Sequence, residues 1–461
     1  MKKDILKIFS SNLIKMMVTF ITAFLVPMVL SVDDYGYYKI YTFYAAYIGV
    51  LHCGYCDGIY LEYGGKGENE ISRDRMSGEL ATIFTYSVGL ALIACTWGIV
   101  RGDFTIICLG LTVVPNIVYT FYSYVYQATG DFKKYTLMLN FSTVSNLLLN
   151  GLLVLFQIRD YRAYIVACVI VQMISFIVGT FYFKQSGWTQ KSRFSAKVLI
   201  KYIKMGVLLM LGNFAYTFFI GIDKWFIKFT LSITDFSMYS FASQMLTVVN
   251  MFITPISMTL YSHFSRRKDH EFERKVKQLL VAILMLMPVV IYAVSFVVET
   301  FMTKYCDSIN LVSLLLTTQI FLSLNLAVFV NLYKSYKMQN SYIRSLLVAL
   351  GIAVLFDFTI SAFSPNAVLY AGATMLSCII WLSINETKFP FMKPTVKDLI
   401  YVFSLLLLFF VLEEVNSNIF LKAFVYTVVY LIVTRILKKS EWTYLIKILY
   451  CFANKICVKN R

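Results

Sequence analysis

The segment Ser31-Val-Asp-Asp-Tyr-Gly-Tyr-Tyr38 separates two long apolar stretches near the start of this 461-residue chain. A related segment, Ser232-Ile-Thr-Asp-Phe-Ser-Met-Tyr239, separates two more, 201 positions later. Equivalent residues around them keep the same order: Asn12 and Asn213, Tyr60 and Tyr261, and, at an offset of 207, Tyr126 and Tyr333, and Tyr135 and Tyr342. This pattern predicts two related halves.

Fourteen apolar stretches run through the chain, and most reach the roughly 17–25 residues that a helix needs to cross about 30 Å of hydrocarbon. They lie at 10–32, 36–61, 80–100, 104–129, 134–157, 161–183, 205–230, 235–262, 278–300, 310–332, 341–362, 366–386, 398–412 and 418–436. Open sheets cannot lie in lipid, so these stretches predict helices. We expect an all-α integral membrane protein with about 14 transmembrane helices.

The composition leaves no room for a large soluble domain, because 59% of the residues are hydrophobic and only 15% are charged. The longest polar gaps, at 63–79, 184–204 and 264–277, are too short to fold alone. The nine Cys are scattered and mostly lie in apolar segments, which excludes a disulfide framework. Cys53 and Cys56 form a C-x-x-C pair, but only His52 is near enough to join them, so we expect no metal site there.

The positive charges lie mainly on one side of the predicted helices. With both termini in the cytoplasm, 33 of the 42 Lys and Arg fall in the tails and even-numbered loops. Six fall on the opposite side: Arg101, Arg159, Arg162, Lys228, Lys304 and Lys422. This bias predicts cytoplasmic termini. It also explains the net charge of +17 through insertion and contact with anionic inner-leaflet lipids, so nucleic acid is not an expected partner.

The repeat suggests a domain organisation of two six-helix lobes. Six helices separate the copies, so the repeats are parallel and a substrate site is expected between them, in a central cavity. We predict an N-lobe at 1–184, a cytoplasmic linker at 185–204, a C-lobe at 205–386, a helix pair at 387–439 and a basic amphipathic cytoplasmic tail at 440–461. The linker's 194–204 segment is expected to lie flat on the inner leaflet, as is the tail.

No motif in the sequence supports catalysis. The loop Gly64-Gly-Lys-Gly67 lacks the Gly and the Ser or Thr that a Walker A motif requires at fixed positions, so ATP is not expected as the direct energy source. The chain has three His, no Gly-x-Ser-x-Gly motif and no long outer loop. We therefore expect no catalytic residues, no enzyme activity and no cofactor. Coupling to H⁺ or Na⁺ is left open.

Ionisable residues at membrane depth are the most informative signal, because each costs about 2.5–3.5 kcal/mol to insert and by default faces a cavity or a partner. Lys15 and Asp57 lie at similar depth in the first two spans. They would form either an interhelical ion pair or a cationic site for an anionic substrate. Lys39 either snorkels to the outer interface or faces inward. Asp357 is expected to cap a helix at the outer interface.

Asp223 and Lys224 lie in the outer part of the seventh span. Adjacent helical residues point about 100° apart, so Asp223 does not neutralise Lys224 directly. We predict that Lys224 faces a cavity, whereas Lys228 snorkels. Polar amides such as Asn213 mostly hydrogen-bond between helices, although a subset could bind sugar hydroxyls.

Three motifs carry a family resemblance: Val26-Pro-Met-Val-Leu-Ser-Val-Asp-Asp-Tyr-Gly-Tyr-Tyr38, Tyr126-Gln-Ala-Thr-Gly-Asp-Phe-Lys133, and Leu199–Gly206 leading through Asp223-Lys-Trp-Phe-Ile227 to Tyr239. The chain resembles the polysaccharide-exporter branch of the multidrug/oligosaccharidyl-lipid/polysaccharide flippase superfamily, and within it the O-antigen flippases of the Wzx type. Ser237 departs from the pattern, because typical relatives and the first half (Gly36) carry Gly there.

The resemblance implies two lobes around a cavity and transport of an undecaprenyl-diphosphate-linked glycan across the bacterial inner membrane by alternating access. It implies roles in O-antigen and lipopolysaccharide biosynthesis, with other polysaccharide-assembly membrane proteins as partners. Lys15, Lys39 and Lys224 would neutralise the diphosphate, with Asp57, Asp223 and Asn213 also lining the cavity. The alternative is a multidrug antiporter for organic cations that uses Asp57, Asp223 and Asp357. A scaffold without transport is the third class.

Overall fold

The computed structural model describes residues 2–188, 192–266, 268–415, 417–444 and 446, and these residues are helical with no β-strand among them. The prediction of an all-α membrane protein is confirmed. The chain forms two compact units, Met1–Phe218 and Phe219–Arg461. Their boundary falls inside the long helix Ala196–Thr230. The predicted lobes and the linker at 185–204 stay a prediction.

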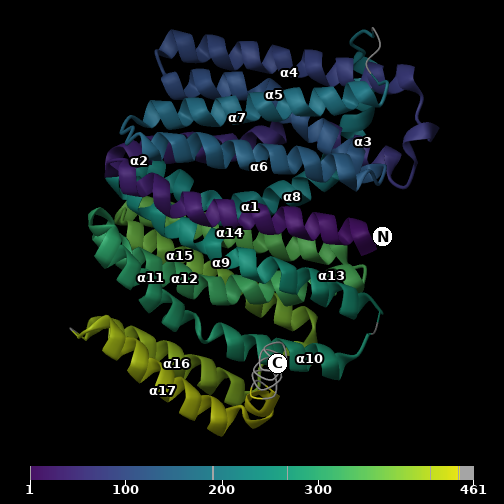
Figure 1. Cartoon of the computed structure of the whole chain (residues 1–461). Helices are drawn as coiled ribbons and strands as arrows, with labels where there is room; N and C mark the ends of the chain where they lie inside the picture. Colours follow the sequence, from purple (N-terminus) through teal and green to yellow (C-terminus); the bar gives the residue numbers. More distant parts are fainter. Residues whose placement is uncertain (1, 189–191, 267, 416, 445, 447–461) are drawn as a thin grey trace, which may run out of the picture. The chain divides into compact units, whose positions relative to one another are not determined.

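Unit 1 is a helix bundle in which α4 packs on α5, α1 on α6, and α7 on both α5 and α6. Its elements are α1 (Lys2–Val29), α2 (Val32–Ile48), the 3₁₀ turn η1 (Gly49–His52), α3 (Tyr55–Tyr63), η2 (Glu68–Glu70), α4 (Arg73–Arg101), α5 (Phe104–Ala128), α6 (Phe132–Leu155), α7 (Tyr161–Gln185) and the first part of α8 (Ala196–Thr230). Figure 1 shows α4, α5, α7 and α6 running side by side, and α1 packs on α6.

Unit 2 is built around α12, which contacts α9, α10, α11 and α15. Its elements are the rest of α8, α9 (Ile233–Arg266), α10 (His270–Leu284), α11 (Met287–Phe301), η3 (Thr303–Ser308), α12 (Ile309–Leu324), the π-helix η4 (Asn325–Phe329), α13 (Val330–Ser335), α14 (Gln339–Phe363), α15 (Ala367–Lys388), η5 (Pro390–Met392), α16 (Val396–Glu414) and α17 (Ile419–Leu437). Figure 1 shows α16 and α17 as an adjacent pair, and α17 packs on α11.

Each of the fourteen apolar stretches falls on helical elements, but a count of fourteen spans is not confirmed. Within the described residues, ten helices are long and apolar enough to cross a membrane. An eleventh is obtained if α9, bent by 41° between its two parts, is one span. The stretches at 10–32, 36–61 and 398–412 do not pass this test as single helices.

The repeated segment that organises the sequence is a helix cap in both units. The Ser31 hydroxyl accepts the backbone N–H of Asp34 at 3.1 Å and donates to the Asp34 carboxylate at 2.6 Å. Ser232 makes the same two bonds with Asp235, at 3.1 and 2.6 Å. A Ser at this position satisfies a backbone N–H of the first turn, which explains why the motif recurs at equivalent helix starts.

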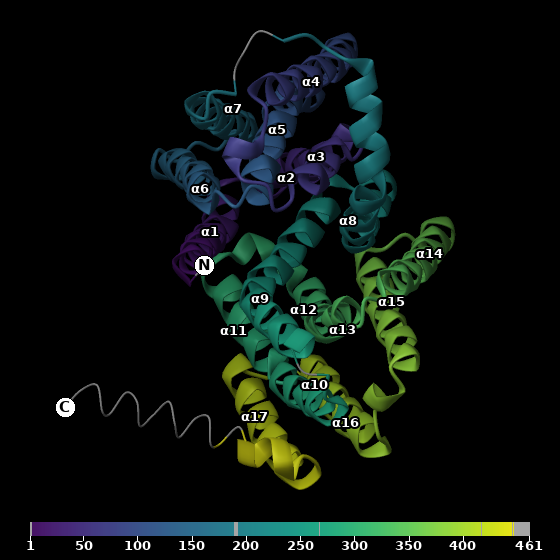
Figure 2. The same ribbon diagram turned by 90° about the vertical axis from the view of Figure 1, so that its right-hand side faces the viewer.

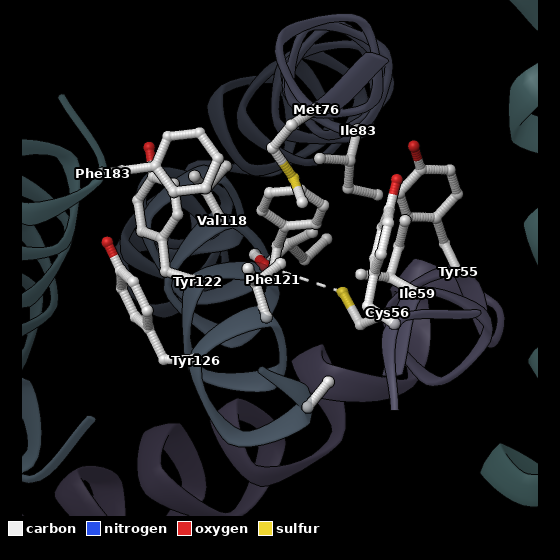
Figure 3. Packing of buried hydrophobic residues seen from close by; sticks show 14 of the residues in the cluster. Tyr55, Cys56, Ile59, Met76, Ile83, Val118, Phe121, Tyr122, Tyr126 and Phe183 are labelled. Carbon is white, nitrogen blue, oxygen red and sulfur yellow. Dashed lines mark hydrogen bonds between the residues drawn. The ribbon is translucent and has the colours of Figure 1, made fainter. Parts of the chain in front are cut away.

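The core of unit 1 is largely aromatic and lies where α3, α4, α5 and α7 meet. In Figure 3 Tyr55 and Cys56 of α3 approach Phe121 of α5 and Met76 of α4, and each of these four side chains is buried. The Cys56 thiol lies 4.0 Å from the Ile117 carbonyl. Cys56 therefore packs a helix interface, and the described residues contain no cluster of three or more His, Cys, Asp or Glu suited to a metal ion.

The linker does not form a separate surface helix. The segment 194–204 leads directly into α8, which is continuous from Ala196 to Thr230. The apolar residues predicted to face the inner leaflet therefore belong to the start of a long helix. The predicted amphipathic tail at 440–461 lies almost wholly outside the described residues, so it stays a prediction.

Candidate functional site

The second apolar stretch is broken in the middle. The pattern over 36–61 predicted one continuous helix, and the structure corrects this: α2 ends at Ile48, and α3 starts at Tyr55 after η1. Cys53 and Gly54 have left-handed backbones, with φ values of 51° and 86°. The Tyr86 hydroxyl donates to the Leu51 carbonyl at 3.0 Å, which satisfies one acceptor at the break. Non-helical backbone at membrane depth is tolerated only where protein buries it or where it lines a cavity.

A buried acid–imidazole pair flanks this break. His52 and Asp57 are 4% and 2% exposed, and the Nε2 of His52 lies 3.8 Å from the Asp57 carboxylate. The His52 Nδ1 accepts the Gly54 N–H at 3.0 Å, so in the neutral ring Nε2 carries the proton and faces Asp57. The sequence placed Lys15 beside Asp57. In the structure the described partner of Asp57 is His52, and the Lys15 side chain is exposed on α1.

Helix α8 crosses the break with direct backbone contact. A Cβ atom on Gly206 would lie 2.1 Å from the Gly54 carbonyl oxygen and 2.2 Å from the Gly58 nitrogen. A Cβ on Gly58 would lie 2.2 Å from the Tyr202 carbonyl oxygen. Only glycine permits this approach, so these glycines hold α8 against the start of α3.

The same crossing brings together an aromatic cluster from α2 and α8. The Tyr47 ring lies 6.2 Å from Phe214 and 6.4 Å from Phe218, between ring centroids, and Phe43 lies 5.3 Å from Tyr47. These rings are partly exposed. Asn213, predicted as a site residue, is exposed next to Phe214. Partly exposed aromatic faces beside an amide could contact a sugar.

A second buried acidic site lies in unit 2. Asp223 is buried, and its carboxylate accepts hydrogen bonds from Tyr239 of α9 and, at 3.0 Å, from Thr374 of α15. Asp357 of α14 is a second buried carboxylate of this unit, 1% exposed, and its Oδ1 has no hydrogen-bond partner among the described residues. Its predicted role as a cap at the outer interface stays a prediction. Burial of a carboxylate favours its protonation or a bound cation.

The predicted cationic residues lie in different surroundings. Lys224 is partly buried and follows Asp223, whose charge acts on it electrostatically, and no salt bridge within 4 Å is described for it. Lys39 lies over the rings of Tyr35 and Tyr38, 5.2 and 5.9 Å from their centroids, which is a cation–π environment. Whether any of the six predicted residues binds substrate stays a prediction.

A polar network that the sequence did not reveal closes one end of unit 1. The buried carboxylate of Glu79 in α4 accepts hydrogen bonds from Tyr63 at 2.8 Å and from Tyr202 of α8 at 2.5 Å. Arg75 bridges Glu79 at 3.1 Å and Glu62 at 2.7 Å. The hydrogen bond from Arg75 lowers the pKa of Glu62. No periodicity marks these residues, because they come from three separate helices.

Comparison with known proteins relates the chain to one protein family and one fold. The profile of a family described as polysaccharide biosynthesis proteins matches residues 76–310. No curated protein sequence matches the chain significantly.

Among solved structures, a lipid II flippase, MurJ, in an inward closed conformation has a TM-score of 0.70 at 13% identity, covering 97% of this chain and 100% of that one. An inward-facing multidrug resistance MATE transporter of the MOP superfamily has a TM-score of 0.50 at 12% identity, covering 83% and 99%. A eukaryotic MATE transporter has a TM-score of 0.50 at 11% identity, covering 93% and 98%. At such identities the likeness establishes the fold.

Proposed function

Because the chain belongs to the polysaccharide biosynthesis protein family, we propose that it moves a lipid-linked glycan across a membrane by alternating access. The resemblance to this flippase superfamily, stated from the sequence motifs, is confirmed. Family and fold are those of transporters and flippases rather than of catalytic enzymes. The family match carries the proposal, and the many apolar helices of this multi-pass membrane protein support it.

The proposed substrate is an undecaprenyl-diphosphate-linked repeat unit of O-antigen or a similar surface polysaccharide. The proposed location is the bacterial inner membrane, with both termini in the cytoplasm, as the charge bias predicts. A diphosphate cannot enter hydrocarbon without a compensating cation. Lys15, Lys39 and Lys224 are the proposed cations. The exposed position of Lys15 and the absence of a described salt bridge at Lys224 support this role.

The proposed contacts to the sugar come from the aromatic cluster Phe43, Tyr47, Phe214 and Phe218, with Asn213 beside it. The proposed coupling ion, H⁺ or Na⁺, binds in unit 2 at Asp223 and Asp357. This assignment is supported by the burial of both carboxylates. Hydroxyl groups donate hydrogen bonds to Asp223 but not to Asp357 among the described residues. A bound proton or cation would lower the cost of holding both at membrane depth.

The test is replacement of the chain by variants in its own host. Loss of the chain should abolish surface glycan and accumulate the lipid-linked intermediate. Lys15→Ala and Lys224→Ala should each reduce glycan display, whereas Lys→Arg at the same positions should restore it. Lys228→Ala, one turn from Lys224, is the matched control and should leave display intact.

Intact surface glycan after deletion would refute the flippase proposal. Increased sensitivity to cationic drugs without a change in glycan would favour the multidrug antiporter. Normal display by the double variant Lys15→Ala, Lys224→Ala would refute only the cationic role of these two residues.

A further inference from the structure

A recess opens in unit 2 where α16 departs from the body of the bundle. It is lined by α10, α12 and α15 on one side, by the turn after η5, and by the start of α16 on the other. The space not filled by atoms is about 800 Å³, its open side included. Figure 2 shows α10, α16 and the end of α15 in the same part of this unit. The recess involves none of the residues assigned above to glycan or coupling-ion binding.

The interior of the recess is apolar. Its floor is made by buried side chains of four elements, among them Met285, Ile320, Leu324, Leu382 and Met392. Leu399 of α16, 57% exposed, forms part of the outer edge. An apolar hollow at the side of a membrane helix bundle is reached from the hydrocarbon, so acyl chains rather than water match its lining.

Charged side chains gather in the same lining, and positive charge is in excess. Two of the four basic groups are already paired. Buried Lys277 contacts Glu386 at 2.6 Å and the Met392 carbonyl at 2.5 Å, and buried Lys438 pairs with Asp398. The other two, Arg274 and Lys393, have no ion pair within 4 Å among the described residues. Lys438 also lies 3.8 Å from the Glu441 carboxylate. Arg274 and Lys393 are therefore the two basic groups of the lining that no described carboxylate pairs.

All of these charges lie at one membrane face. Arg274 precedes the apolar part of α10, Lys393 lies between α15 and α16, and Lys438 follows α17. The charge bias assigns these three segments to the cytoplasmic side. Basic pockets between helices at this face are suited to anionic lipid headgroups, and each Lys or Arg near the surface strengthens that attraction.

We propose that this recess binds one anionic phospholipid of the cytoplasmic leaflet. The headgroup phosphate lies between Arg274 and Lys393, and the first part of the acyl chains lies over the partly exposed or exposed Ile379, Leu399 and Val402. The paired Lys277 and Lys438 hold the walls of the recess in place rather than neutralising the phosphate. The two basic groups without an ion pair select phosphatidylglycerol or cardiolipin over phosphatidylcholine. This proposal does not rest on the transport function.

The test uses the full chain purified in detergent, with phosphatidylglycerol, cardiolipin or phosphatidylcholine added in defined amounts. Bound lipid is counted by native mass spectrometry, and the melting temperature is recorded in parallel. The variant Arg274→Gln, Lys393→Gln removes the two unpaired charges. The matched control Lys388→Gln, Lys397→Gln removes two exposed charges from the same helix ends outside the recess. A third variant, Ser383→Trp, fills the recess from α15 and leaves its charges unchanged.

The wild-type chain and the control variant should bind anionic lipid with equal affinity, and the bound lipid should raise the melting temperature of both. The double variant Arg274→Gln, Lys393→Gln should bind anionic lipid about thirtyfold more weakly, and added lipid should raise its melting temperature much less. The Ser383→Trp variant should no longer bind anionic lipid, but without lipid it should melt at the wild-type temperature. Three results would overturn the proposal: equal binding of phosphatidylcholine, equal loss in the control pair, or retention of a polyprenyl-linked lipid in place of phospholipid.

Discussion

Replacing Gly206 by alanine tests the crossing of α8 over the broken second span. An ordinary Cβ contact lies at 3.4–4 Å, but the added carbon would lie 2.1 and 2.2 Å from backbone atoms of Gly54 and Gly58. Backbone cannot rotate away as a side chain can, so α8 and α3 must separate by more than 1 Å. Overpacking of this kind costs about 1–3 kcal/mol, and alanine regains up to about 1 kcal/mol of helix propensity. Because both clashes are with backbone atoms, the cost lies at the upper end of this range, about 3 kcal/mol, and we expect a net loss of about 2 kcal/mol.

The assay is thermal unfolding of the purified protein, followed by intrinsic fluorescence. For a unit of this size, about 2 kcal/mol corresponds to a fall of roughly 4–8 °C. The control is Gly89→Ala, also in the interior of a helix of unit 1, where a Cβ would meet no atom within 4 Å. It should melt at or slightly above the wild-type temperature. If the two variants melt within about 1 °C of each other, the close approach of α8 and α3 is wrong.

Three further outcomes follow from the hydrogen bonds. Ser31→Ala and Ser232→Ala should each cost about 1 kcal/mol in unfolding free energy, and clearly unequal losses would contradict the equivalence of the two caps. Tyr239→Phe removes a donor to buried Asp223 and should cost about 1–3 kcal/mol, measured by chemical unfolding; no change would refute the bond. The pKa of Glu62 is lowered, so its ion pair stabilises the protein above the usual Glu pKa and the benefit is lost as pH falls through the folded value. The ion pair contributes less than about 1 kcal/mol because it is partly exposed. The higher melting temperature of wild type relative to Glu62→Gln should therefore persist at pH 7 and disappear as the pH falls below about 4.

Much of the fold could be predicted because lipid imposes one rule, that each backbone polar group is satisfied within a helix. Apolar length therefore located the helices, and the Ser31 and Ser232 segments located equivalent helix starts. The break at Gly54 could not be predicted in this way. Its residues continue the apolar pattern, and the left-handed turn depends on the contact with Gly206, more than 150 positions away.

The sequence predicted which residues belong to the candidate sites better than it predicted the partners that these residues contact. Asp57 and Asp223 were identified because buried carboxylates are costly in a membrane. Their partners were not: His52 rather than Lys15 lies beside Asp57, and Tyr239 and Thr374 hold Asp223. Hydroxyl and imidazole donors are common in membrane helices, so composition alone does not single them out. Depth estimates along a helix also do not specify which neighbouring helix a side chain meets.

The π-helix at Asn325–Phe329 has a consequence for how the chain tolerates changes in length. A π turn holds one residue more than an α turn of similar rise, and such bulges arise at single-residue insertions. Asn325 and Asn331 on either side of it bond to different helices, the former to the Cys378 carbonyl of α15 and the latter to the Ser257 carbonyl of α9. Deleting one residue within the turn would restore an α-helix but rotate one asparagine by about 100° away from its partner. Related chains that are one residue shorter here should therefore lack one of the two asparagines.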